Sequence, residues 1–129
     1  MKNRFSIIYF ILLAFCFSCN SPDKYSPSVN NGQIDLTGWD FNNNGIINLN
    51  GTWEFYWKKL YFPEDFIQKK TGACDIYLRV PSSWRGELIK GENIFGKGFA
   101  TYHSVIKLPI PHGNNWGLKI MDCFSAYRV

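Results

Sequence analysis

The chain has 129 residues, a formal net charge of +4 and 46% hydrophobic residues, which is typical of one globular domain. Its longest basic runs are two pairs, Lys58-Lys59 and Lys69-Lys70. A nucleic-acid-binding protein needs a concentrated basic face, so composition and charge predict no nucleic-acid partner.

The first residues have the pattern of a bacterial lipoprotein signal. Lys2 and Arg4 precede an uncharged apolar run at residues 5–17, which is shorter than the about 20 residues of a membrane-spanning helix. The following "CFSCN" resembles a lipobox, in which the signal is cut before the cysteine and the cysteine is acylated. We therefore predict a signal peptide at residues 1–18 and lipidation at Cys19. Secretion without a lipid, or an uncleaved anchor, is the alternative.

This signal predicts a protein held at the membrane by a lipid and facing the periplasm or the exterior of a bacterial cell envelope. Residues 19–33 are rich in Ser, Pro and Asn and have little to bury, so we predict a flexible tether there. The folded domain is then expected at residues 34–129.

Nearly every segment of this domain has a strand signature, because short runs of β-branched and aromatic residues are broken by Gly, Asn and Pro. We predict a turn at residues 39–45 and a tight reversal at Asn50-Gly51, since both residues tolerate positive φ. Strands are predicted at residues 34–36, within 46–60, at 76–80, at 98–108, at 116–121 and from 126 onward.

Residues 63–70, "PEDFIQKK", form the one predicted helix. Pro63 suits the first helical turn, and the acidic residues near the start and lysines near the end complement the helix dipole. A helix of about two turns needs tertiary packing, for which we expect Phe66 and Ile67 to serve.

The sequence "TWEFYWK" at residues 52–58 alternates in a way that sorts its side chains by face. Trp53, Phe55 and Trp57 share one face of the predicted strand, which we expect to point inward. Glu54, Tyr56 and Lys58 share the other, which we expect to be polar and to point outward. Burying one large aromatic stabilises by about 1.5–3 kcal/mol, and exposed apolar patches are the exception. We therefore predict that this row fills the core of a β-sandwich, rather than forming a ligand platform. The same alternation in 98–108 places Tyr102 and Ile106 on one face.

No catalytic constellation stands out in the sequence. "DFNNNG" at residues 40–45 matches the first half of a calcium loop, but the twelfth position is Gly51 rather than Glu, so we predict an Asx-rich turn. His103 and His112 have no partner at ligand spacing, so we predict no metal site. We predict no enzymatic activity and no cofactor.

Two pairs of residues leave alternatives open. Glu87 and Glu92 flank a loop, where they are either surface charges or a carboxylate pair for glycoside cleavage. Cys74 and Cys123 remain after signal cleavage; an oxidising periplasm permits a disulfide, and two separate thiols are the alternative.

Trp84 in "VPSSWRG" follows a proline and two serines, where a strand is expected to leave its sheet. A tryptophan there offers a stacking face and a polar group to sugars or peptides. The alternative is a tryptophan tucked under its own turn.

Four stretches in order resemble the galactose-binding-like jelly roll, as in the sugar-binding domains of family-2 glycoside hydrolases: "LNGTWEFYW", "VPSSWRG", "GFATYHSVIKLP" and "LKIMDCFSAYRV". Residues 34–57, "IDLTGWDFNNNGIINLNGTWEFYW", resemble the opening of the version placed before seven-transmembrane bacterial signalling receptors. The resemblance implies an all-β jelly-roll sandwich with one short helix. Such a fold uses about eight strands, more than the sequence provides, so we expect the domain to be incomplete at its C-terminal end.

The resemblance also implies a function. We expect a non-enzymatic, extracytoplasmic module that senses a carbohydrate or small polar ligand for a membrane signalling receptor. The alternatives are an accessory sugar-binding domain of a family-2-like glycosidase and a free-standing surface lipoprotein. Trp84, Arg85 and His103 are the candidate ligand-binding residues.

Overall fold

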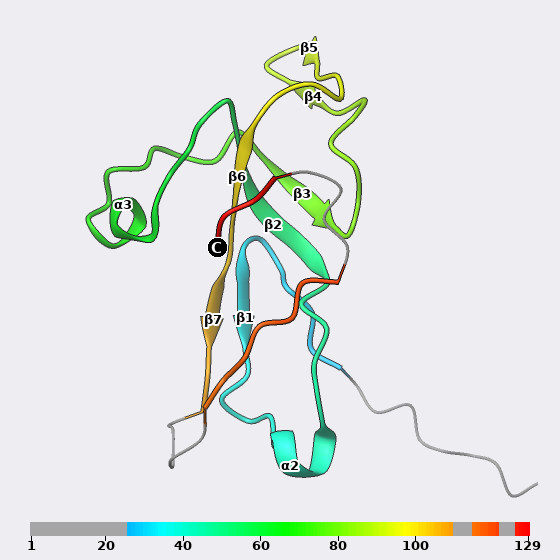
Figure 1. Cartoon of the computed structure of the whole chain (residues 1–129), viewed down its shortest axis with the longest axis vertical. Coiled ribbons are helices and arrows are strands. Elements are labelled where there is room, and N and C mark those ends of the chain that lie inside the picture. Colours follow the sequence, from blue (N-terminus) through cyan, green and yellow to red (C-terminus); the bar gives the residue numbers. More distant parts are fainter. Residues whose placement is uncertain (1–25, 110–114, 122–125) are drawn as a thin grey trace, which may run out of the picture.

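The computed structural model describes residues 26–109, 115–121 and 126–129. The predicted signal peptide at 1–18 and Cys19 lie outside these residues. The elements in chain order are β1 (Gln33–Asp35), α2 (Phe41–Asn44), β2 (Gly51–Trp57), α3 (Pro63–Ile67), β3 (Ile76–Val80), β4 (Leu88–Ile89), β5 (Glu92–Asn93), β6 (Ala100–His103) and β7 (Val105–Lys107) (Figure 1). The described chain is mostly strands with few short helices, so the prediction of a β-rich fold is confirmed.

The strands form three small sheets among the described residues. The central sheet is antiparallel, with the order β3-β2-β6, while β1 and β7 pair in parallel and β4 and β5 form a hairpin. Figure 1 shows β7 continuing the line of β6 toward α2, with β1 beside it. Strand β2 is therefore the middle strand of the central sheet, and its side chains contact both hydrophobic clusters described below.

Helix α2 forms where the sequence predicted only a turn. The Asp40 carboxylate accepts hydrogen bonds from the backbone N–H groups of Asn42 and Asn43, and Gly45, with φ of 74°, follows the last helical residue. These bonds satisfy N–H groups that a helix start leaves without an intrahelical partner. The Asx-rich turn is thus present, tightened into one helical turn, and its carboxylate serves as a cap.

The packed chain begins earlier than the predicted domain boundary at residue 34. Val29 is buried, its N–H donates to Asn50 O at 2.8 Å, and its carbonyl accepts from Thr52 N–H at 2.9 Å. The end of the predicted tether is therefore part of the fold. Gly51 is required by this approach rather than by a tight reversal: a Cβ there would lie 1.9 Å from Val29 O.

The predicted strand at 98–108 is broken at Ser104 into two strands that serve different sheets. β6 pairs with the second half of β2, whereas Gly32 N–H donates to Thr52 O at 2.8 Å in its first half. The N-terminal segment thus occupies the edge of β2 along which β6 would have to continue for one long strand to form. The chain after Ser104 therefore pairs with β1, as β7. Tyr102 packs against the first core cluster, and Val105 and Lys107 are exposed.

The aromatic row of β2 lies in the core, as predicted. Phe55 is fully buried and packs with Trp57 in a first cluster, while Trp53 packs against a second cluster around Val29. The buried members of the two clusters are Phe55, Leu78, Ile89 and Ile94 in the first, and Val29, Ile34 and Leu36 in the second. The prediction of a polar opposite face was wrong at Tyr56, which is only 3% exposed.

The segment that contains α3 covers Tyr56. The Tyr61 and Phe66 rings lie 5.3 and 5.6 Å from the Tyr56 ring, between centroids. α3 ends at Ile67, before the predicted end at residue 70, and Ile67 is 79% exposed, so only one of the two expected packing residues packs. The Asp65 carboxylate accepts from Phe62 N–H at the helix start.

The described C-terminal residues do not form the predicted strands. Residues 115–121 and 126–129 have no regular structure. Trp116 packs against Phe41, with 4.5 Å between ring centroids, and the Arg128 guanidinium lies 4.9 Å from the Phe62 ring centroid. These segments thus contact the fold by side chains.

No helix within the described ranges is long and apolar enough to cross a membrane. Cys74 has no disulfide partner among the described residues, and Cys123 lies outside them.

Candidate functional site

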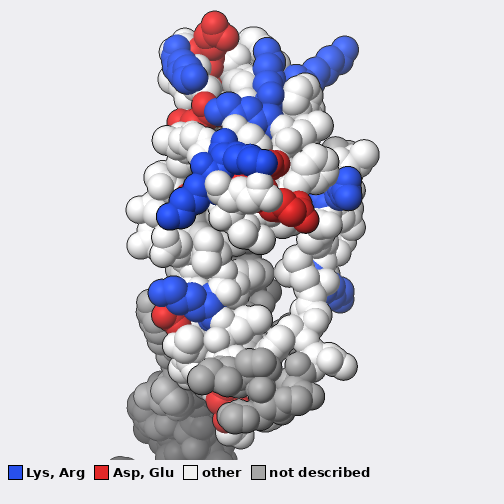
Figure 2. Space-filling model, turned by 90° about the vertical axis from the view of Figure 1, so that its left-hand side faces the viewer, with Lys and Arg blue, Asp and Glu red and all other residues white. Residues whose placement is uncertain are grey.

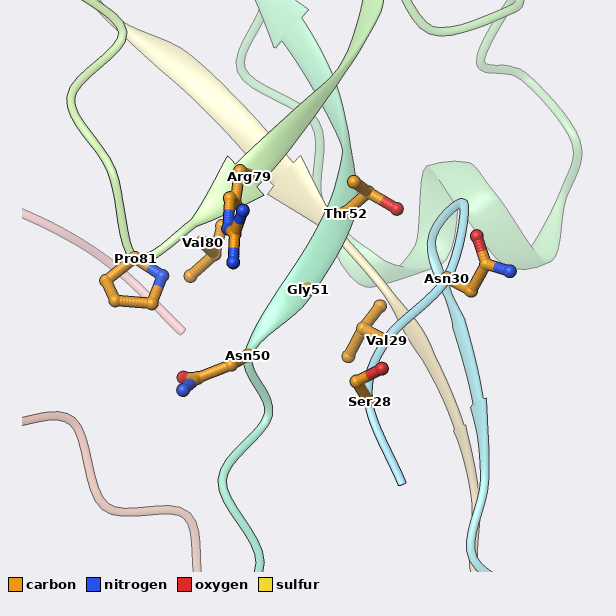
Figure 3. A pocket seen from close by; sticks show the side chains of 9 residues that line it. All are labelled: Ser28, Val29, Asn30, Asn50, Gly51, Thr52, Arg79, Val80 and Pro81. Carbon is orange, nitrogen blue, oxygen red and sulfur yellow. The ribbon is translucent and has the colours of Figure 1, made fainter. Parts of the chain in front are cut away.

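An open hollow of about 410 Å³ lies where β2 begins and β3 ends (Figure 3). Its volume is within the range of about 300–1,000 Å³ that is usual for small-molecule sites. Three chain segments line it: Ser28, Val29 and Asn30; Asn50, Gly51 and Thr52; and Arg79, Val80 and Pro81.

The backbone holds these three segments together. The register pairs Gly51 with Val80 across β2 and β3, and Val29 is hydrogen-bonded to Asn50 and Thr52 on the other side. Pro81 has no N–H to continue the ladder, so β3 ends at the rim. The walls are therefore set by ladder hydrogen bonds rather than by loop conformation alone.

Polar side chains border this hollow. Figure 3 shows the Arg79 guanidinium directed toward the Asn50 side of Gly51, the Asn50 amide extending away from Ser28, and the Asn30 side chain pointing away from Arg79. The Thr52 hydroxyl accepts from Asn31 N–H at 2.9 Å. A guanidinium, an amide and a hydroxyl, with the apolar rings and methyls of Pro81 and Val80, suit a small polar molecule with a hydrocarbon face.

Trp84 lies in the first core cluster rather than at the hollow. Its ring centroid lies 6.1 Å from that of Phe55, 5.7 Å from that of Trp57 and 6.4 Å from that of Tyr102. The ring is half-buried. This placement is closer to the alternative of an anchoring tryptophan than to a ligand contact.

His103 lies on the other side of the central sheet. Its ring stacks on Phe66, with 3.8 Å between centroids, and its Nδ1 lies 2.7 Å from Glu54 Oε2. Glu54 and Phe55 are successive residues of β2 and point to opposite faces, so His103 and Trp84 are separated by the sheet. Arg85 is exposed after Trp84. The structure does not bring the three predicted residues together, and none of them lines the hollow.

Glu54, Tyr56 and His103 form a polar cluster beneath the α3 segment. The Tyr56 hydroxyl donates to Glu54 Oε2 at 3.1 Å. Burial raises the pKa of Tyr56 above its ordinary value, and the hydrogen bond to Glu54 raises that pKa further. Glu54 is the hydrogen-bond partner of both Tyr56 and His103. The rings of Tyr56 and His103 in turn contact Phe66, which packs the α3 segment against the sheet. The predicted alternation already placed Glu54 and Tyr56 on one face.

A second, smaller hollow of about 230 Å³ lies beside Trp57 and the β4-β5 hairpin. Asp75, with a side chain only 7% exposed, accepts from Trp57 N–H at 2.9 Å and pairs with Lys59 at 3.1 Å and Lys90 at 3.8 Å. Asp75 thus pairs with two of the three lysines that line this hollow. Glu92 lines it, but Glu87 does not.

Charges of both signs are mixed on the face of the molecule shown in Figure 2, where acidic side chains lie among the lysines and arginines. No group of three or more His, Cys, Asp and Glu side chains in the described part of the chain could hold a metal ion.

In comparisons with known proteins, no protein-family model, no curated protein and no solved structure matches this chain.

Proposed function

We propose that this chain is a non-enzymatic ligand-binding module, a β-sandwich of the galactose-binding-like jelly-roll type, which binds a carbohydrate or another small polar molecule in the hollow at the β2–β3 end. The observation that carries the proposal is the hollow itself: Arg79, Asn50 and Ser28 present polar groups on a backbone frame of three hydrogen-bonded segments. The resemblance of residues 34–57 to receptor-associated domains supports the same class of function.

The position of the hollow supports a role in sensing. One of its walls, residues 28–30, directly follows the segment proposed to run to the lipidated Cys19. A ligand that bridges this wall to β2 and β3 stabilises the docked state of the segment, because it binds only when all three walls are in place. Ligand occupancy would then be transmitted to the membrane anchor of an extracytoplasmic, lipid-anchored receptor component.

The proposal is tested by titrating the protein with a panel of neutral and acidic monosaccharides while recording amide NMR spectra. The amides of Ser28, Gly51 and Val80 are expected to shift together. Asn50→Trp fills the hollow from an exposed position and should weaken binding by about tenfold or more. Asn48→Trp, at an exposed position of the same segment that does not line the hollow, is the matched control.

Two results would contradict the proposed site. One is a saccharide that binds Asn50→Trp as tightly as the unaltered chain. The other is a set of shifts confined to residues around the smaller hollow, such as Lys59 and Lys90.

A further inference from the structure

Resting on the proposed function, we infer that the ligand of this hollow is an acidic sugar, a uronic acid, whose carboxylate is bound by Arg79. The inference concerns the chemical class of the ligand. Four observations carry it: the net charge of the lining, the missing counter-ion of Arg79, the position of the acidic residue next along the same face, and the polar groups left over for the rest of the sugar.

Among the described residues, the lining has one formal charge. Arg79 is the only ionised side chain of this described lining, and the other eight residues are Ser, Asn, Thr, Gly, Val and Pro. A guanidinium is charged at all physiological pH values and presents its N–H donors as a planar fork. A fork of this kind matches the two oxygens of a carboxylate, with which it forms paired, charge-assisted hydrogen bonds.

Arg79 has no ion-pair partner within the described chain. The ion pairs there join Lys59 and Lys90 to Asp75 and Lys107 to Asp35, while the Glu54 carboxylate lies within hydrogen-bond distance of His103. An unpaired arginine on an open surface is ordinary. Arg79 differs because it borders a hollow, where an anion can reach its donors.

Glu54 is the acidic residue that could be expected to neutralise Arg79. Arg79 pairs with Thr52 and Tyr77 with Glu54 in the register of β2 and β3, so the two charged residues are diagonal neighbours on one face. Glu54 Oε2 instead lies 2.7 Å from His103 Nδ1, on the β6 side of the sheet. The cluster beneath α3 thus holds this carboxylate on the side away from β3.

The remaining lining fits the other parts of a sugar. Asn50 and Ser28 offer donors and acceptors for ring hydroxyls, and Pro81 offers an apolar surface for the hydrocarbon face of the ring. A uronic acid has one negative charge, which a single guanidinium balances. A phosphate monoester has about 1.5 to 2 negative charges at neutral pH and would be left undercompensated here.

The test compares matched pairs of sugars that differ only in the carboxylate: galacturonate with galactose, and glucuronate with glucose. Calorimetry and amide NMR are expected to show that the full chain binds at least one uronate about tenfold or more tightly than its neutral counterpart, since charge-assisted hydrogen bonds are the strong ones. Arg79→Gln should remove this preference, because glutamine keeps a donor but not the charge. Arg79→Lys should retain only part of it, because lysine has no fork.

Arg128→Gln is the matched control, since Arg128 lies over Phe62 and does not line the hollow. It removes the same charge and should leave the preference unchanged. Thermal unfolding midpoints of the Arg79 variants that equal that of the unaltered chain exclude a folding defect.

The possible outcomes separate this inference from the proposed function. If neutral sugars shift the amides of the hollow as strongly as uronates, the acidic ligand is wrong and the binding module stands. The acidic ligand is equally overturned if uronates bind there but Arg79→Gln binds them as tightly as the unaltered chain. If galactose 1-phosphate binds more tightly than galacturonate, the carboxylate assignment is overturned. If no sugar, charged or neutral, perturbs these amides, the proposed function itself is contradicted.

Discussion

Tyr56 is buried because the α3 segment covers it, although it lies on the face of β2 that was predicted to be polar. Its ring lies under Tyr61 and Phe66, and its hydroxyl donates to Glu54. The pKa of Tyr56 is raised first by burial and then by Glu54, which accepts the phenol proton and repels a phenolate. The folded chain therefore favours the neutral phenol more strongly than the unfolded chain does.

This preference predicts how stability depends on alkaline pH. A raised folded-state pKa contributes stability that is fully present below the unfolded value of about 10 and is lost as pH rises through the folded value. The free energy of unfolding should thus fall as pH rises above about 10, and Tyr56→Phe should make the fall shallower. Urea unfolding at a series of pH values between about 8 and 11 measures how the free energy of unfolding changes with pH.

The exposed Tyr127 provides the control, because Tyr127→Phe should leave the pH profile of stability unchanged. The pKa of Tyr77 is also raised, chiefly by its hydrogen bond with Cys74, and that contribution remains in both variants. Parallel profiles for Tyr56→Phe and the unaltered chain would show that the buried phenol is not the source.

Arg79 is the residue that the sequence pattern missed. Within "IYLRV" it occupies an outward position of a strand, where a charged side chain reads as solvated surface. The role proposed for Arg79 depends on the docking of Val29 against Gly51, far away in the sequence. Local alternation predicts which face a residue takes, but it contains no information about which distant segment forms a wall beside it.

At the scale of elements, α3 shows what a short helix needs. The helix was predicted from its proline start and its charges, and its aromatic contacts with the rest of the fold come from one residue, Phe66. The Phe66 ring stacks on His103 and meets Tyr61, with 5.7 Å between centroids. The neighbouring Ile67 has no such contact and is exposed. A helix of one to two turns does not persist without such packing.

The two neighbouring residues therefore provide a matched pair of substitutions. Phe66→Ala should lower the free energy of unfolding by about 1–3 kcal/mol, less than for a fully buried phenylalanine because Phe66 is half-buried. Ile67→Ala should change it by less than about 0.5 kcal/mol, since it removes only exposed surface. Urea unfolding of both variants measures the difference. Equal losses would mean that helix propensity, rather than the aromatic contact, holds α3.

The elements predicted best are those decided by their own residues. The strand at residues 76–80 was expected with the bounds it has, and the core face of β2 was assigned correctly. The break at Ser104 was not predicted, because it arises from the hydrogen bond between Gly32 and Thr52. Likewise the polar face of β2 was misjudged, since the α3 segment folds back over it. Each of these features depends on contacts between distant segments.

At the scale of the whole molecule, the segment at residues 26–32 connects the two hydrophobic clusters. Val29 packs in the second cluster with Ile34 and Leu36, while its backbone pairs with β2, which also contributes Phe55 to the first cluster. The same segment forms one wall of the proposed ligand site. The hollow therefore has its third wall only when this segment is docked on β2.

This coupling predicts the effect of shortening the chain. A chain that begins at Gln33 loses the burial of Val29 and its backbone hydrogen bonds to Asn50 and Thr52, which a chain beginning at Ser26 keeps. Burying a valine stabilises by about 1.5–3 kcal/mol and each hydrogen bond by about 1 kcal/mol, so the shorter chain should be less stable by roughly 3 kcal/mol or more. Urea unfolding of the two chains, each starting with an added methionine, measures the loss. Coincident unfolding curves would mean that residues 26–32 lie on the fold without stabilising it, and the hollow would then lack a fixed third wall.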